Sequence, residues 1–245
     1  HMPVISEGIL SGIVSLGEFG LLFVLPLFVQ GVLGYDPMQT GVLLLALAAG
    51  SFLASGAGAR LAMRAGAVRV LQLGMLLEAI GIAGIGLALS THATRLVLAP
   101  ELFLYGLGIG FATAQLTGVI LREVPVHVSG QAAAVQSTSR QVGAAIGTAI
   151  LGAMLSVATV HSVTAELLAR GASAAKASEF AEFVTNTSGQ MIQFLILQPN
   201  GKAMVAGAHE GFATATQFVA AGATAFVVLG LIASLRLPRD TDSSH

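Results

Sequence analysis

The stretch QAAAVQSTSRQVGAAIGTAILG, from Gln131 to Gly152, decides the fold, because it has the composition of a membrane-spanning helix. It is apolar and rich in glycine, and its one charged residue, Arg140, lies well inside it. A cation at the centre of a bilayer costs roughly 3 kcal/mol on insertion scales. We therefore expect Arg140 to face protein or water rather than lipid. The alternative is that its long side chain reaches the cytoplasmic headgroups.

The composition of the whole chain predicts the same class. Hydrophobic residues make up 55% of the 245 residues and charged residues only 9%. A soluble domain carries about 25% charged residues. The charges stand in short clusters between apolar runs of membrane-spanning length, and the alternation typical of strands is absent. The sequence thus predicts an integral membrane protein built of helices.

The sequence also argues against an enzyme. It has no cysteine, which excludes disulfides and thiolate metal sites, and its six histidines do not pair at the spacing of metal ligands. It contains no nucleotide-binding loop, no catalytic triad and no metal-ligand set. We expect no catalytic activity, no cofactor, no bound metal and no nucleic-acid partner.

Hydropathy predicts six membrane-spanning helices. They cover about residues 5–33, 38–62, 68–90, 95–121, 129–160 and 211–235. The second has a clear start signal, because Asp36 suits the N-cap, Pro37 suits the first helical position and Gln39 completes a capping box.

The distribution of arginine predicts the orientation in the membrane. Connections on one side, together with the C-terminal end, hold Arg60, Arg64, Arg69, Arg122, Arg236 and Arg239. The short loops on the other side hold only Arg95. Short cytoplasmic loops are enriched in arginine and lysine, so both termini are expected in the cytoplasm.

The domain organisation follows from these spans. We expect five transmembrane helices in residues 3–160, an extracytoplasmic loop in 161–208, the last helix in 209–237 and a cytoplasmic tail in 238–245. Apolar residues at helical spacing predict an amphipathic surface helix in the loop: Val163, Leu167, Ala174, Ala177, Phe180 and Val184. Asn200-Gly201, between two apolar runs, predicts a β-hairpin.

The first helix carries the strongest candidate for chemistry. Ser11, Ser15 and Glu18 recur at i, i+4 and i+7 and so share one face, which Phe19 and Phe23 flank. One interpretation is a carboxylate in a cavity that binds protons or a cationic substrate. The other is a protonated glutamate that packs against a neighbouring helix.

Two further helices carry polar residues inside the membrane. Glu78 is either a proton site or, as we favour, a protonated group in an interhelical hydrogen bond, because no polar stripe accompanies it. In the fourth helix, Glu101, Tyr105 and Gln115 share a face that also holds glycines. Tyr105 and Gln115 are candidate substrate contacts, Glu101 is expected near the outer, solvated end, and the glycines are better explained by helix packing.

The fifth helix places four notable residues on one face. Gln136, Arg140, Gly143 and Gly147 recur at helical spacing, and the two glycines form a small-xxx-small packing motif. This pattern predicts a tight helix interface that holds a buried cation.

These motifs resemble one family. The residues Gly130-Gln131 and Ser137 to Gly143, followed by Ile146 to Ala149, are similar to the penultimate helix of the fourteen-helix drug/proton antiporters of the major facilitator superfamily. The run LPLFVQGVLGYDPMQTGVLLL at 25–45 resembles the first two helices of that family's C-terminal half. The resemblance extends along essentially all six spans.

The family's cytoplasmic gate motif, G-x-L-A-D-R-x-G-R, is similar to residues 59–67 of this chain, ARLAMRAGA. Met63 replaces the aspartate and Ala67 the second basic residue, which puts a charge-relay gate in doubt. The resemblance assigns the cytoplasmic gate loop to Arg60, Arg64, Gly66 and Arg69.

The resemblance implies an all-α, polytopic membrane protein whose six helices form a 3+3 inverted-repeat half of the major facilitator fold. It implies the C-terminal half of a proton-coupled exporter of hydrophobic or cationic compounds in the bacterial inner membrane, with the proton gradient as the energy source. The implied partners are the N-terminal half of the same transporter or another copy of the chain, small-molecule substrates and the lipid bilayer.

The resemblance also assigns directions to the helices. The first and fourth would line the central cavity, the second and fifth would face the other half, and the third and sixth would face outward. This favours Glu18 over Glu78 as the functional carboxylate. Two alternatives stay open: an exporter of lipids that uses the long outer loop as an exit guide, and a non-transporting membrane interaction module or excised fragment.

Overall fold

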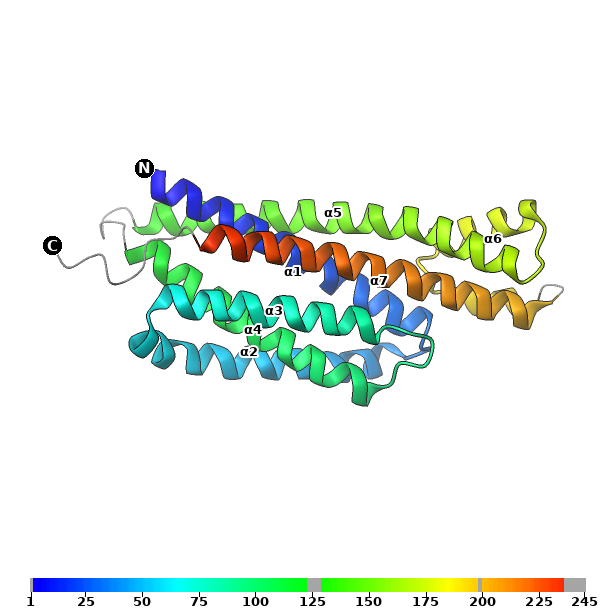
Figure 1. Ribbon diagram of the computed structural model, residues 1–245, viewed down its shortest axis with the longest axis horizontal. Coiled ribbons are helices and arrows are strands. Elements are labelled where there is room, and N and C mark those ends of the chain that lie inside the picture. Colours follow the sequence, from blue (N-terminus) through cyan, green and yellow to red (C-terminus); the bar gives the residue numbers. More distant parts are fainter. Residues whose placement is uncertain (1, 123–128, 198–199, 236–245) are drawn as a thin grey trace.

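The chain folds into a bundle of long helices that run nearly side by side (Figure 1). The structure, a computed structural model, describes residues 2–122, 129–197 and 200–235. Its elements are α1 (Met2–Gly31), α2 (Pro37–Ala65), α3 (Ala67–Ala88), α4 (Arg95–Arg122), α5 (Ser129–Ala169), α6 (Ala174–Asn186), the 3₁₀ helix η2 (Ile192–Leu197) and α7 (Gly201–Ser234). Six of the described helices, α1 to α5 and α7, are long and apolar enough to cross a membrane. The six predicted spans are therefore confirmed.

Local sequence signals set the start of α2 as predicted. The Gln39 amide donates to Asp36 Oδ1 at 2.7 Å, and the Asp36 amide donates to Gln39 Oε1 at 3.2 Å. These reciprocal bonds satisfy backbone donors that a helix start otherwise leaves unpaired. Pro37 occupies the first turn, where its missing N–H costs nothing.

A single glycine joins α2 to α3. Gly66 has φ +89°, a conformation that side chains with a Cβ rarely adopt, and it ends one helix while it begins the next. The link is therefore far tighter than the loop that the sequence predicted between residues 62 and 68.

The packing order of the helices is interleaved. α1 packs against α5 and α7, and α4 packs against α2 and α3. If α1 to α3 form one repeat and α4, α5 and α7 the other, the α1–α5 pair corresponds to α4–α2, and α1–α7 corresponds to α4–α3. This correspondence is the pattern that two inverted three-helix repeats produce. The repeats therefore share one bundle instead of forming separate units.

Small residues allow the close approach within these pairs. A Cβ at Gly143 or Gly147 of α5 would meet the α1 backbone at Gly12 and Leu16. In the corresponding α2–α4 pair, a Cβ at Gly50 or Gly106 would likewise meet backbone of the facing helix. Membrane helices associate through such close backbone contacts, because lipid is as apolar as the side chains.

The segment at residues 161–208 differs from the prediction. The expected amphipathic helix is split, because Val163 and Leu167 belong to α5, which continues to Ala169. No glycine or proline interrupts α5 after Gly152, and the chain turns only at Gly171, with φ +83°. Helix α6 then packs back against α5 with its apolar residues Ala177, Phe180, Ala181 and Val184 buried.

The predicted β-hairpin at Asn200-Gly201 is wrong. Residues 192–197 form η2, and Asn200, with φ +61°, precedes the first turn of α7, which begins at Gly201 rather than near residue 211. An Asn-Gly pair signals a hairpin because it tolerates the left-handed conformation that a hairpin turn needs. Here Asn200 adopts that conformation before a helix instead. Pro199, Arg236, Arg239 and the tail at 238–245 lie outside the described residues.

Longer α5 and α7 give the molecule an extension. At the end opposite to the start of α1, these two helices and α6 reach past α2, α3 and α4 (Figure 1). We name this part the outer extension; it comprises residues 161–197 and 201–210.

Candidate functional site

The polar face of α1 is buried where three helices meet. Ser11, Ser15 and Glu18 are at most 5% exposed. The Tyr105 hydroxyl of α4 donates a 2.8 Å hydrogen bond to the backbone carbonyl of Glu18. The Glu18 carboxyl group interacts electrostatically with Arg140 of α5. The predicted face is thus directed into the bundle.

The aromatic residues beside this face are more accessible. Phe19 is 37% and Phe23 49% exposed, which is high for large apolar side chains. They lie on the side of α1 that the bundle leaves open.

Glu78 of α3 belongs to the same site, although the sequence placed it apart. Its side chain is fully buried, and within the described residues neither of its carboxyl oxygens has a hydrogen-bond partner. It interacts electrostatically with both Glu18 and Arg140. The expected interhelical hydrogen bond is therefore not formed within the described residues. Glu78 reaches this site because Gly108 of α4, which has no side chain, lets the Glu78 backbone approach closely.

The α5 face around Arg140 meets α1. Gln136 is buried, Arg140 is half-buried, and Gly143 and Gly147 touch the α1 backbone. Arg140 therefore faces protein on one side, and it interacts electrostatically with the carboxyl groups of Glu18 and Glu78.

Together Glu18, Glu78 and Arg140 form what we call the membrane charge cluster. Two carboxyl groups and one guanidinium, if all are ionised, leave one negative charge unbalanced. An unbalanced charge inside a membrane costs several kcal/mol. The cluster is therefore suited to hold one exchangeable proton, or to attract one cationic group, and to change state when either leaves.

The predicted polar face of α4 is a packing surface. Tyr105 is fully buried with its backbone against Gly81 of α3, and the Glu101 carboxyl group lies against Gly84. Gln115, 6% exposed, lies against α2. The structure thus gives these residues helix contacts, which small residues on α2 and α3 allow by letting α4 approach closely. Glu101 stays half-buried, and substrate contacts at Tyr105 and Gln115 remain predictions.

The residues of the predicted gate loop lie on helices. Arg60 and Arg64 are exposed near the end of α2, and Arg69 is exposed in the first turn of α3. Arg64 also complements the partial negative charge at the C-terminus of α2. Gly66 is the only residue between them that is not helical.

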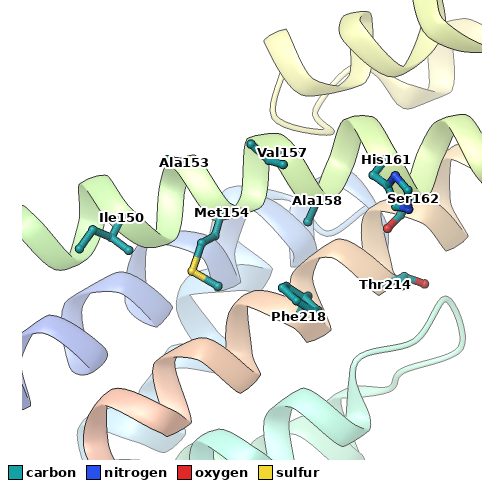
Figure 2. A pocket seen from close by; sticks show the side chains of 9 residues that line it. All are labelled: Ile150, Ala153, Met154, Val157, Ala158, His161, Ser162, Thr214 and Phe218. Carbon is teal, nitrogen blue, oxygen red and sulfur yellow. The ribbon is translucent and has the colours of Figure 1, made fainter.

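An apolar groove of about 600 Å³ lies between α5 and α7. Met154 of α5 and Phe218 of α7 point into the space between the two helices, and His161 lies at its outer end (Figure 2). We call it the lateral groove.

A second hollow, of about 320 Å³, lies between α1, α5 and the turn after α6. Phe23 lines it, and so do five hydroxyl residues that the sequence reading missed: Thr148, Ser156, Thr159, Thr185 and Ser188. We call it the hydroxyl cavity. The spacing of Thr148, Ser156 and Thr159 on one helical face was a visible signal. The part supplied by Thr185 and Ser188 depends on how the outer extension folds back, which local sequence does not show.

Comparison with known proteins identifies the family of this chain. The sequence profile of the Major Facilitator Superfamily matches residues 2–148, more than half of the chain. A multidrug resistance protein B homolog of Mycobacterium tuberculosis is 30% identical over 61% of this chain and 28% of its own length. A puromycin resistance protein of Streptomyces alboniger is 34% identical over 60% of this chain and 30% of its own length.

A third relative is named for a different substrate. A triacylglyceride transporter of Mycolicibacterium smegmatis is 35% identical over 52% of this chain and 24% of its own length. This chain therefore spans less than a third of the length of each of these relatives.

Proposed function

The chain belongs to the major facilitator superfamily, and from this premise we propose that it is the C-terminal half of a proton-coupled transporter that exports hydrophobic or cationic compounds. The similarity to proteins named for multidrug and puromycin resistance supports this proposal. The observation that carries it is the membrane charge cluster, since Glu18, Glu78 and Arg140 together provide a place for one proton inside the bundle.

The cluster suggests how proton and substrate exchange. A proton that neutralises one carboxyl group removes the unbalanced charge, and a cationic substrate near Glu18 would have the same effect. The two would then compete for the same negative charge, which is the physical requirement of exchange. Tyr105 holds the Glu18 backbone in place, because its hydroxyl joins α4 to α1 at that residue.

A second half is part of the proposal. Helices α2 and α5 are the least buried of the described spans: 22% and 28% of an 18-residue apolar stretch in each is buried, against 56% in α1. The N-terminal half of the same transporter, or another copy of the chain, would cover these faces. We further place the protein in the bacterial inner membrane with both ends in the cytoplasm, as the arginine distribution predicts.

The experiment is Glu18→Gln in the transporter that contains this chain. The substitution keeps the shape and the hydrogen bonding but removes the charge. We expect export of a cationic dye, ethidium, to fall by about tenfold or more, and export of an uncharged compound to fall much less, because one missing charge contact is worth roughly 1.5–3 kcal/mol. Glu179→Gln, at an exposed site of α6, is the matched control.

Unchanged export of both compounds by the Glu18→Gln protein would make Glu18 a packing residue and remove the basis of the proposal. Loss of both to the same extent, with normal folding, would mean that the carboxyl group serves proton coupling alone. If no compound is exported by the unaltered transporter, the chain is an interaction module instead.

Export of a lipid is the second candidate. The lateral groove favours it, because its lining is almost entirely apolar and it extends toward the outer extension. The similarity to a triacylglyceride transporter supports the same candidate. Phe218→Asp would place a charge in the groove. A lipid exporter would lose transport of triacylglyceride, whereas a drug exporter would keep its transport of ethidium.

A further inference from the structure

The hydroxyl cavity contains one polar group that the fold does not satisfy. Thr159 is 1% exposed, and within the described residues its hydroxyl has no hydrogen-bond partner. A buried hydroxyl without a partner costs roughly 1–3 kcal/mol by mutational measures. A threonine in a helix usually avoids this cost by donating to the carbonyl four residues earlier.

The other two buried threonines of the described residues follow that rule. Thr40 donates to the Asp36 carbonyl at 3.0 Å, and Thr216 donates to the Phe212 carbonyl at 2.8 Å. Thr159 differs, and it is a residue that lines the cavity. The exception therefore points to a partner that binds in the cavity.

The cavity has a defined outer wall. The turn at Ser188 and Gly189 forms its outer side, and Ser188 has φ +49°. The Phe212 ring lies against Gly189. This turn is tied to the end of α1, because Gln190 Nε2 donates to the Leu27 carbonyl at 3.4 Å and Gly189 touches Gly31. The outer extension thus forms one wall of the cavity.

The lining determines what can bind. None of the described lining residues carries a charge; aromatic rings of Phe23 and Phe212 lie among hydroxyl groups and aliphatic side chains. Binding a cation in such a place would require desolvation without an opposite charge, which is costly. An uncharged, apolar molecule that offers a hydrogen-bond acceptor avoids that cost.

We propose that the hydroxyl cavity is a binding subsite for uncharged, hydrogen-bonding apolar molecules, with the Thr159 hydroxyl as their specific contact. This inference rests on the proposed export function, because it names the kind of compound that this half of the transporter holds. Cations would be bound instead near the membrane charge cluster, so the two classes of substrate would have separate contacts.

A fluorescent reporter tests binding directly. The chain has no tryptophan, so Phe23→Trp creates a single reporter in the cavity, and Phe218→Trp creates a matched reporter in the lateral groove. The purified chain in lipid nanodiscs is titrated with Nile red, an uncharged apolar dye with a carbonyl acceptor. We expect saturable quenching in the Phe23→Trp protein and only linear quenching, from dye dissolved in lipid, in the Phe218→Trp protein.

A second substitution tests the contact. In the Phe23→Trp background, Thr159→Val should weaken the binding of Nile red roughly fivefold, the value of one ordinary hydrogen bond. Thr216→Val is the control, because Thr216 is equally buried, bonds to its own helix and does not line the cavity. Ala149→Phe, which fills the cavity from a lining position, should abolish saturable quenching.

Several results would overturn the proposal: linear quenching at both reporters, equal affinity after Thr159→Val, saturable binding that survives Ala149→Phe, or tighter binding of ethidium than of Nile red. The titration requires no proton gradient. Absent binding together with a normal effect of Glu18→Gln on export would therefore refute the subsite and leave the proposed function intact.

Discussion

For Arg140 the sequence left two options: a side chain that faces protein, or one that reaches the lipid headgroups. The structure shows what surrounds it. Its side chain is half-buried on α5, and it interacts with the carboxyl groups of Glu18 and Glu78. Its position could be inferred from hydropathy alone. The proximity of Glu78 could not be inferred, because hydropathy does not show that Gly108 lets α3 and α4 approach closely at that level.

Replacing Arg140 should damage the protein more than replacing Arg95. Arg140→Ala leaves two buried carboxyl groups without the nearby cation. We expect a loss of at most about 3 kcal/mol in the free energy of unfolding, the low end for a broken buried ion pair, because Arg140 is only half-buried and, within the described residues, no ion pair joins it to either carboxyl group. Arg95 is exposed and stacks over the Tyr35 ring at 4.9 Å, so Arg95→Ala should cost little. Thermal unfolding in detergent measures both. Equal melting temperatures would mean that Arg140 reaches the headgroups.

At the scale of the element, the sequence predicted features that depend on neighbouring residues, and it failed where the structure depends on contacts between distant segments. The cap of α2 depends on Asp36, Pro37 and Gln39 alone, and it forms as predicted. The length of α5 and the conformation of residues 170–197 depend on how α5 packs against α6 and α7. No local sequence pattern indicates this packing. The hairpin prediction failed for the same reason, since Asn200 uses its left-handed conformation to begin α7.

The contact between α5 and α1 can be tested with two glycines of one helix. A Cβ at Gly143 would meet the backbone of Gly12, so Gly143→Ala must push the helices apart and should cost about 1–3 kcal/mol, as overpacking does. At Gly152 the nearest atom to a Cβ is 3.9 Å away, in the Phe23 ring, so Gly152→Ala should be neutral or stabilising by up to about 1 kcal/mol. The melting temperatures of the two variants measure these effects. A neutral Gly143→Ala would contradict the close contact.

An ion cluster holds the outer extension together. Arg170 pairs with Glu166 and, at 2.7 Å, with Glu210, which joins the end of α5 to α7. The hydrogen bonds that Arg170 donates to the carboxylates of Glu166 and Glu210 raise its pKa above the usual value. A group with a raised pKa stabilises the fold below its unfolded pKa, so Arg170 contributes at every practical pH, and its contribution does not change between pH 5 and pH 9.

Removing this arginine should loosen the extension without affecting the bundle. Arg170→Gln should lower the local stability by about 1 kcal/mol or less, because exposed ion pairs are screened by solvent and salt. Hydrogen–deuterium exchange should rise in α6 and at the ends of α5 and α7, by a similar factor at pH 6 and pH 8. Lys202→Gln, at an exposed site nearby, is the control. Faster exchange throughout α1 to α4 would show that the cluster supports the whole bundle instead.

At the scale of the whole molecule, the orientation in the membrane is open to direct measurement. The chain has no cysteine, so single cysteines can be introduced without background. A cysteine at Arg64, on the end of α2, should react with a membrane-impermeant reagent only from the cytoplasm. A cysteine at Lys176, in α6, should react from outside the cell. The reverse labelling pattern would overturn the arrangement with both ends inside.

The central claim is that this chain supplies one half of an exporter. The most direct measurement reconstitutes residues 1–245 as monomers in vesicles with a proton gradient and follows ethidium and internal pH together. A single half provides only one wall of a site that lies between repeats at the midplane. We predict that ethidium and proton movement will match those of protein-free vesicles, whereas vesicles with the complete transporter accumulate the dye. Ethidium accumulation driven by the proton gradient in vesicles that contain only monomers of this chain would contradict the account.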